Sequence, residues 1–246
     1  MIRTSSAPLS TPRRTALFAG LLVALAAAAF APRVTRAGES AVKIAPPAVD
    51  TTTGASGTQT AVFAGGCFWG VQGVFQRVNG VVQAVSGYSG GAKETAQYEM
   101  VGSGLTGHAE AVKITYDPKK VSYGTLLQIY FSVAHDPTQL NRQEPDSGPQ
   151  YRSAVFYADA AQKETTEKYI AQLDAAKSYP RKIVTQVVPL TAFYAAEAYH
   201  QDYLLNHPSQ PYIVFNDLPK VGHLKELFPS AYRDEPVTVY ASNARR

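Results

Sequence analysis

Short apolar runs and helical periodicities alternate along residues 60–206. Residues 60–65 (TAVFAG) form a continuous apolar run, which is typical of a buried strand. Apolar residues then recur at the spacing of one helical face, at Val71, Val74, Phe75 and Val78. This stretch therefore predicts a buried strand followed by an amphipathic helix.

The same alternation continues toward the C-terminus. Strand patterns occupy residues 81–88, 109–116, 153–157 and 183–188. Helical patterns occupy residues 122–133, 160–177 and 192–206, the last of which ends before Pro208. Helices separate most of the strands, but one strand pair has no helix between its members. This order predicts an α+β fold, a two-layer α/β sandwich with a mixed sheet, in one domain.

The first 37 residues differ in composition from the rest. They contain five arginines and no acidic residue, and residues 15–31 form an apolar run of 17 residues that is mostly alanine. A charged region, an apolar region and small residues before Gly38 are the pattern of a signal peptide. We therefore expect residues 1–37 to be a cleaved signal and the protein to be periplasmic. A membrane anchor is less favoured, because a spanning helix needs about 20 strongly apolar residues.

The export route and the next segment follow from composition. The pair Arg13-Arg14 leaves the twin-arginine and general secretory routes both open. Residues 38–59 are rich in Ser, Thr, Ala, Gly and Pro, which predicts a flexible linker. Residues 60–246 are then the folded domain. Without the leader, 18 basic residues face 19 acidic ones, so the basic charge does not indicate a nucleic-acid partner.

A single cysteine, Cys67, carries the most distinctive chemistry. A chain with one cysteine has no internal disulfide, so the thiol is either a small buried apolar group or a reactive group. Cys67 lies between a predicted strand and a predicted helix, where unpaired N–H groups and the helix dipole favour an anion. We therefore expect a lowered pKa for this thiol. Phe68 and Trp69 follow directly and predict a pocket for a small apolar group beside the sulfur.

Glu110 is an acidic residue in the strand pattern of residues 109–116. Because side chains alternate along a strand, it shares a face with Val112, Ile114 and Tyr116. A carboxyl on such a face is desolvated, and desolvation raises its pKa and suits it to general acid catalysis. The pattern alone leaves open the alternative that Glu110 lies at a frayed strand end, in water.

Several segments, taken together, resemble one known family. They are GCFWG at 66–70, SGYSGG at 86–91, Tyr98 before VGSG at 101–104, TGHAE at 106–110, HDPT at 135–138 and DSGPQYRS at 146–153. In this order and spacing they resemble the A-type peptide-methionine sulfoxide reductases, over about residues 60–228. The resemblance implies a ferredoxin-like α/β plait with additional elements, which agrees with the predicted element order.

The resemblance also implies a role for each site residue. Cys67 would attack the sulfoxide sulfur, and Glu110 would protonate the departing oxygen. Tyr98 and Tyr151 would donate hydrogen bonds to that oxygen, and Asp146 would help to orient the site. Phe68 and Trp69 would pack on the substrate's methyl group. The substrate would be the S epimer of methionine sulfoxide, free or in proteins, so that the enzyme repairs oxidative damage in exported proteins.

The same resemblance sets expectations for partners. Many family members carry C-terminal cysteines that resolve the sulfenic acid formed on the nucleophile, but this chain carries Gln210-Pro211-Tyr212-Ile213 in that region. We therefore expect an external thiol reductant: a thioredoxin-like protein, a glutaredoxin-like protein or a small thiol. No bound cofactor or metal is expected, and the protein is expected to be a monomer. Two smaller departures from the family pattern are Gln72 and Glu144-Pro145.

Two other classes of function fit parts of the pattern. A cysteine hydrolase or acyltransferase would use a histidine as base, whereas we expect structural roles for His108, His135 and His200. A methionine-binding module without catalysis would tolerate loss of the Cys67 thiol. The spacing of GCFWG and Glu110 favours the reductase over both.

Overall fold

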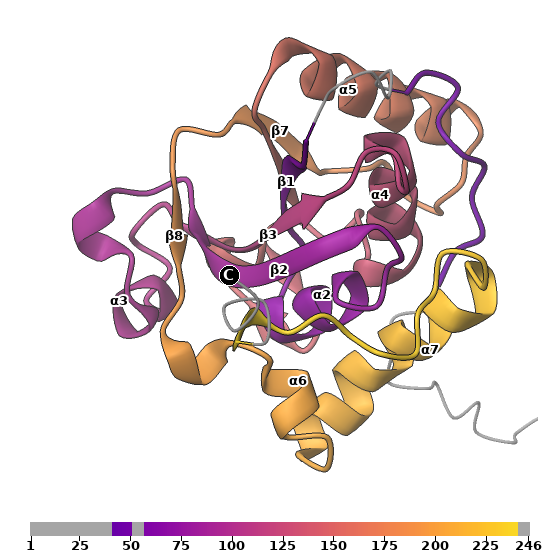
Figure 1. The fold of residues 1–246 in the computed structure, drawn as a ribbon. Helices are drawn as coiled ribbons and strands as arrows, with labels where there is room; N and C mark the ends of the chain where they lie inside the picture. The colour runs from indigo at the N-terminus through magenta and orange to yellow at the C-terminus, as the bar shows by residue number, and fades with distance from the viewer. Residues whose placement is uncertain (1–40, 51–56, 241–246) are drawn as a thin grey trace, which may run out of the picture. The chain divides into compact units, whose positions relative to one another are not determined.

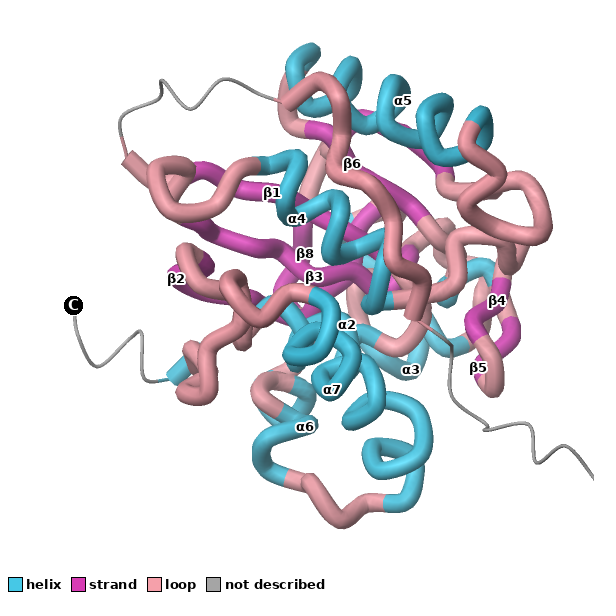
Figure 2. Tube along the Cα trace, turned by 90° about the vertical axis from the view of Figure 1, so that its right-hand side faces the viewer, coloured by secondary structure: helices cyan, strands magenta, loops and turns pink. Residues whose placement is uncertain are grey.

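A computed structural model describes residues 41–50 and 57–240 of the chain, so the predicted leader lies outside the described residues. Six strands form the main sheet, in the order β7-β6-β1-β3-β2-β8. Their bounds are β1 Gln59–Ala64, β2 Val81–Ser89, β3 Ala109–Tyr116, β6 Ala154–Tyr157, β7 Gln186–Pro189 and β8 Phe193–Ala195. The short strands β4 (Arg142–Gln143) and β5 (Asp146–Ser147) form a separate hairpin, seen beside the main sheet in Figure 2.

The four central strands have the connectivity of a ferredoxin-like plait. In the order β6-β1-β3-β2 each neighbouring pair is antiparallel, and β1 is linked to β2, and β3 to β6, through helices. This is the split βαβ arrangement. The added strand β7 pairs parallel with β6, and β8 pairs antiparallel with β2. The predicted mixed sheet with additional elements is therefore confirmed.

The α-helices of the described part connect these strands or follow the last of them. They are α2 Phe68–Phe75, α3 Tyr98–Gly102, α4 Tyr123–Ile129, α5 Ala160–Ala175, α6 Tyr203–Asn206 and α7 Leu218–Leu227. Figure 1 shows α5 beside β7 and places α6 and α7 near α2. Side-chain caps begin two of the helices: Ser122 Oγ accepts from Thr125 N, and Asp159 Oδ1 accepts from Gln162 N. Of the helices in the described part, none is long and apolar enough to cross a membrane.

Alternation along the strands separates two apolar clusters. Phe63 and Val112 belong to the larger cluster, to which α2, α4, α5 and α7 contribute, whereas Ala109 and Ala111 belong to the smaller one. Full burial of a Val or Phe side chain contributes about 2 kcal/mol. Glu110 has the strand parity of Val112, so its carboxyl lies on the helix-covered face and is only 4% exposed. The alternative of a solvated strand end is therefore excluded.

The helix predicted over residues 192–206 is wrong. Residues Phe193–Ala195 instead form β8 and pair with the edge of β2 at Gly87–Ser89. At Gly87 a side chain would collide with the backbone oxygen of Tyr194, so the glycine permits this pairing. Asp202 then has φ 58°, a left-handed conformation that interrupts helical structure and leaves only the short helix α6.

Part of the segment predicted as a linker packs against the domain. Within residues 41–50, Ile44 is 7% exposed and joins the larger apolar cluster. Its backbone oxygen accepts from Gln128 of α4, and the oxygen of Ala45 accepts from the hydroxyl of Tyr169 of α5. Figure 1 shows this indigo segment passing α5. Residues 41–50 are therefore an ordered extension of the fold and not a free linker.

Candidate active site

Cys67 lies at the N-cap of α2, directly after β1, as the sequence predicts. Two glycines make this tight connection possible. Gly66 has φ +85°, and a side chain there would meet Gln143 at 2.6 Å; a side chain on Gly65 would meet His135 at 2.9 Å. Gln143 is itself fixed by hydrogen bonds to both the backbone N–H and the carbonyl of Asp136. The backbone that presents the thiol is thus held from both sides.

Glu110 reaches the same helix terminus from β3. Its Oε2 accepts a hydrogen bond of 3.0 Å from the backbone N–H of Phe68, the residue after the cysteine. Burial raises the pKa of this carboxyl to about 8, opposed by the Phe68 N–H and assisted by Asp146 and Asp217. Near neutral pH Glu110 is therefore mostly protonated and can donate a proton beside Cys67, as a general acid requires.

Rings surround the first turn of α2. The Trp69 indole stacks on Tyr203, with ring centroids 3.8 Å apart and planes 9° apart, and its Nε1–H donates to His200 Nδ1 at 3.2 Å. The Phe68 ring contacts Tyr88 and His200. Both residues predicted to hold a methyl group therefore have fixed rings next to the thiol.

Tyr98 begins α3 and is held by Glu197. One oxygen of Glu197 accepts from the backbone N–H of Tyr98 and the other from the Tyr88 hydroxyl, both at 2.9 Å. Burial raises the pKa of Tyr98 to about 12, and Glu110 and Cys67 add to the shift. The hydroxyl therefore stays protonated as a hydrogen-bond donor.

Tyr151 and Asp146 reach the site from the segment around β5. The pKa of Tyr151 is raised by burial and then by the charges of Glu110 and Asp146. Burial also raises the pKa of Asp146, against a hydrogen bond donated by the hydroxyl of Tyr212. The peptide bond between Glu144 and Pro145, one of the departures from the family pattern, is cis and precedes Asp146.

The expected lowering of the Cys67 pKa is wrong. Burial raises it well above its usual value, and the carboxylates of Asp217, Glu110 and Asp146 raise it further, while the N–H of Trp69 lowers it. The helix terminus does favour an anion, as expected, but burial of the thiol, assisted by carboxyl groups from other segments, outweighs it. Near neutral pH the side chain of Cys67 is therefore a thiol and not a thiolate.

Several residues of the site were not anticipated from the sequence. Tyr212 lies edge-on to Trp69, with ring centroids 6.0 Å apart, while its hydroxyl holds Asp146. Glu197 supports Tyr98, and Asp217 is fully buried close to α2. Single tyrosines and acids so distant in sequence from Cys67 carry no local pattern that marks them. The buried Gln72, which bonds to Ala84 and Gln201, links α2 to the sheet.

We expect Tyr212→Phe to lower kcat/KM about tenfold. The change keeps the ring against Trp69 but removes the hydroxyl that donates to Asp146, and a hydrogen bond to a charged group contributes about 1.5 kcal/mol. Steady-state kinetics with a methionine sulfoxide peptide would measure the effect. Tyr240→Phe, which alters an exposed hydroxyl bonded to Ala198, is a control that should leave kcat/KM unchanged; equal losses in both variants would contradict a role for Tyr212.

The three histidines of the sequence analysis have structural partners. His108 bonds to Gly91 N–H and the Ala92 carbonyl. His135 bonds to the Tyr130 carbonyl and Ser153, and burial lowers its pKa to about 3. His200 accepts from Trp69. None of these contacts in the described part involves Cys67, whereas a cysteine hydrolase pairs its histidine base with the nucleophile. The described residues also contain no cluster of three potential metal ligands.

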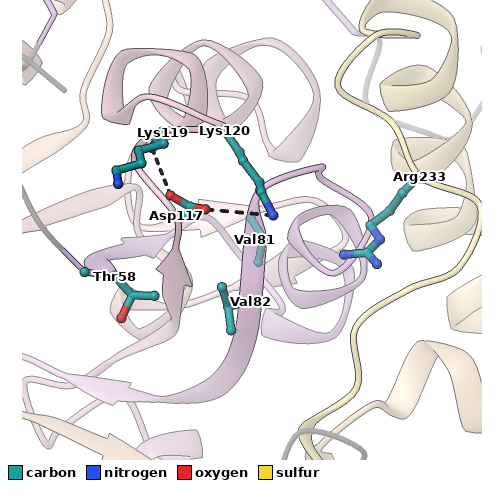
Figure 3. A pocket seen from close by; sticks show the side chains of 9 residues that line it. Thr58, Val81, Val82, Asp117, Lys119, Lys120 and Arg233 are labelled. Atoms are coloured by element: carbon teal, nitrogen blue, oxygen red, sulfur yellow. Dashed lines mark hydrogen bonds and ion pairs between the residues drawn. The ribbon is translucent and has the colours of Figure 1, made fainter.

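A pocket of about 350 Å³ lies at the other end of the strands (Figure 3). Its lining includes Thr58, just before β1, and Asp117, just after β3, whereas Cys67 follows β1 and Glu110 is near the start of β3. Lys120 points to Asp117 across 3.8 Å. The length of β1 and β3 therefore lies between this pocket and the side chains of Cys67 and Glu110.

Comparison with known proteins agrees with the geometry. The family of peptide methionine sulfoxide reductases matches residues 59–231. A curated relative from Mesorhizobium japonicum, peptide methionine sulfoxide reductase MsrA 2, is 62% identical over 77% of this chain and 97% of its own length. Another MsrA 2, from Synechocystis, is 49% identical over 74% of this chain and 86% of its own length.

Solved structures show the same fold. Methionine sulfoxide reductase A of Corynebacterium diphtheriae has a TM-score of 0.55 and 36% identity, covering 67% of this chain and 82% of its own. Reduced Mxr1 from Saccharomyces cerevisiae has a TM-score of 0.57 and 32% identity, covering 62% and 87%. The family match, the relatives and the solved structures agree with a site that places a thiol and a carboxyl at one helix terminus. The chain therefore belongs to the A-type peptide methionine sulfoxide reductase family and reduces methionine sulfoxide.

Proposed function

We propose that Cys67 is the nucleophile and Glu110 the general acid of this reduction. The hydrogen bond from Phe68 N–H to Glu110 Oε2 is the observation that carries the proposal, because it fixes a protonated carboxyl beside the thiol. The sulfur of Cys67 attacks the sulfoxide sulfur while Glu110 gives its proton to the oxygen, and the proton that leaves the Cys67 thiol returns to Glu110, so that the acid is regenerated. The oxygen leaves the substrate on Cys67 as a sulfenic acid, and methionine is released.

The tyrosines stabilise the charge that develops on the sulfoxide oxygen. Tyr98 and Tyr151 keep their hydroxyl protons because of burial, and donors placed at a developing charge in a dry site stabilise it strongly. Asp146, held by Tyr212, orients this side of the site. Phe68 and Trp69 hold the substrate's methyl group, which selects a small apolar substituent at sulfur. All of these groups come from one chain, so a monomer is sufficient for the reaction.

An external thiol completes the cycle. Because Cys67 is the single cysteine, its sulfenic acid must react with a thiol from another molecule, which gives a mixed disulfide and water. A second thiol then releases Cys67 and forms a disulfide in the reductant. We propose a thioredoxin-like protein as the reductant, because its two thiols supply both steps, with a glutaredoxin-like protein or a small thiol as alternatives.

Export places this repair outside the cytoplasm. The arginine-rich start and the apolar run at 15–31 support a cleaved signal and repair of exported proteins in the periplasm. N-terminal sequencing of the active enzyme, purified from the periplasm, would test this. A sequence that still begins at Met1 would contradict cleavage of the signal.

A single-turnover experiment tests the proposed chemistry. Purified protein, mixed with an S-sulfoxide methionine peptide and no reductant, should form about one methionine per enzyme and stop, because no second cysteine resolves the intermediate. A sulfenic-acid reagent should then label Cys67, as detected by peptide mass analysis. Continued turnover without any thiol would contradict the need for an external reductant, and a folded protein that forms no methionine would contradict the chemistry itself.

A further inference from the structure

A buried ion pair lies at the start of α7 and takes no part in the chemistry described above. Asp217 is 0% exposed and Lys220 5%, and Lys220 Nζ lies 3.7 Å from Asp217 Oδ1. Neither oxygen of Asp217 has a hydrogen-bond donor within bonding distance in the described part of the chain. Burying two charges is costly and is weak evidence for a gain in stability, so the pair points to a role other than folding.

The carboxylate of this pair lies against the helix that carries the nucleophile. A side chain at Gly70 would collide with Asp217 Oδ1, which places that oxygen beside the first turn of α2, three residues from Cys67. Gly70 thus permits a close approach of charge to the helix backbone. Both helices that meet at this contact are packed around it: Phe68 of α2 and Leu224 of α7 are buried.

We propose that Asp217 and Lys220 are positioning residues that set the charge at the active site. The Asp217 carboxylate opposes ionisation of the Cys67 thiol in the substrate-free enzyme, and Lys220 keeps that carboxylate ionised inside the protein. The consequence for catalysis rests on the proposed role of Cys67 as nucleophile.

The electrostatics of the site agree with this arrangement. After burial, Asp217 contributes most to raising the pKa of Cys67, ahead of Glu110 and Asp146. Burial raises the pKa of Asp217 itself to about 6, and Lys220 opposes the rise, so Asp217 is mostly charged at neutral pH. Further titratable groups near the thiol stay neutral at neutral pH: Tyr98, Tyr151 and Tyr212, whose pKa values are raised, and His200, whose pKa is lowered by burial.

A suppressed thiolate protects an enzyme that has one cysteine. A thiolate attacks hydrogen peroxide: an S–O bond forms, the O–O bond breaks, sulfur gives up two electrons, and a sulfenic acid and hydroxide result. A second peroxide converts the sulfenic acid to a sulfinic acid, which is irreversible in most proteins. Because thiolate and not thiol reacts, the charge of Asp217 slows this loss until substrate binds.

Alkylation of Cys67 by iodoacetamide, followed against pH in the substrate-free protein, tests the proposal. We expect Asp217→Asn to move the midpoint about one pH unit lower, which makes alkylation at neutral pH about tenfold faster. Asp217→Asn with Lys220→Met removes both charges and should shift the midpoint in the same direction by a smaller amount. Loss of free thiol to hydrogen peroxide should accelerate in the same order.

Two control variants separate charge from disturbed packing. Asp117→Asn alters the pair of half-buried Asp117 and exposed Lys120, which has the same residue types and the same spacing at the other end of the strands. Leu224→Val loosens α7 without changing its charge. An unchanged midpoint in folded Asp217→Asn, or an equal shift in either control, would overturn the proposal. These readouts need no reductase activity, so a failed single turnover would count against the proposed function and not against this charge pair.

Discussion

Cys67→Ser is expected to abolish reduction of methionine sulfoxide, with a fall in kcat/KM of at least about ten-thousandfold. A serine hydroxyl fits the same N-cap position and keeps the backbone connection through Gly65 and Gly66, but it is a much weaker nucleophile toward sulfur. Its oxygen also cannot form the sulfenic acid that carries the substrate's oxygen away. Methionine formation from an S-sulfoxide peptide, measured by chromatography, gives the result directly.

A control measurement must show that the Cys67→Ser variant still folds. Cys67 makes no disulfide, and serine is close to it in volume, so circular dichroism and the thermal unfolding midpoint should match those of the unaltered protein. Peptide binding should also persist, because Trp69 and its stacked partner Tyr203 are untouched. Appreciable turnover by folded Cys67→Ser would remove Cys67 from the role of nucleophile.

Glu110→Gln should lower kcat/KM by about a hundredfold to ten-thousandfold, the usual contribution of a general acid. The glutamine oxygen can still accept from Phe68 N–H, so the helix terminus keeps its partner, but the amide cannot give up a proton to the sulfoxide oxygen. The loss is therefore one of chemistry and should appear in kcat more than in substrate binding.

The pH profile separates this role from a structural one. The pKa of Glu110 is raised to about 8, so the protonated acid is abundant below that pH and is lost as the pH rises through it. In the unaltered enzyme this loss opposes the gain in Cys67 thiolate at high pH. In Glu110→Gln the fall above pH 8 should vanish and only the rise due to Cys67 should remain. A profile identical in both proteins would exclude Glu110 as the acid.

The positions of Cys67 and Glu110 could both be predicted from the sequence, for different reasons. Cys67 was placed by the junction of an apolar run and a helical periodicity, and Glu110 by the two-residue alternation of its strand. Both are local patterns, and the structure confirms both placements. Their meeting at Phe68 N–H depends on the pairing of β1 with β3, which a local pattern does not encode.

Other features depended on distant parts of the chain. The prediction of a lowered Cys67 pKa was wrong because burial of the thiol by distant segments raises the pKa, and Asp217, Glu110 and Asp146, which raise it further, have no local relation to α2. The pattern of residues 192–206 predicted a helix, but the open edge of β2 offered backbone hydrogen bonds that favoured a strand there. In both cases contacts with distant segments outweighed what the local sequence favours: the ionisation of Cys67 in the first and the helix over residues 192–206 in the second.

The ordered segment 41–50 means that the folded unit begins before the part of the chain that the family model matches. The family match begins at residue 59, yet Val42 exchanges hydrogen bonds with Ser132, and Asp50 accepts from Gly124 N–H. A protein cut to begin at residue 59 would lose these hydrogen-bond partners of Gly124 and Ser132 and would uncover the site that Ile44 fills. The segment that leads into the domain is therefore part of the folded unit, because its residues fill and cap the larger apolar cluster.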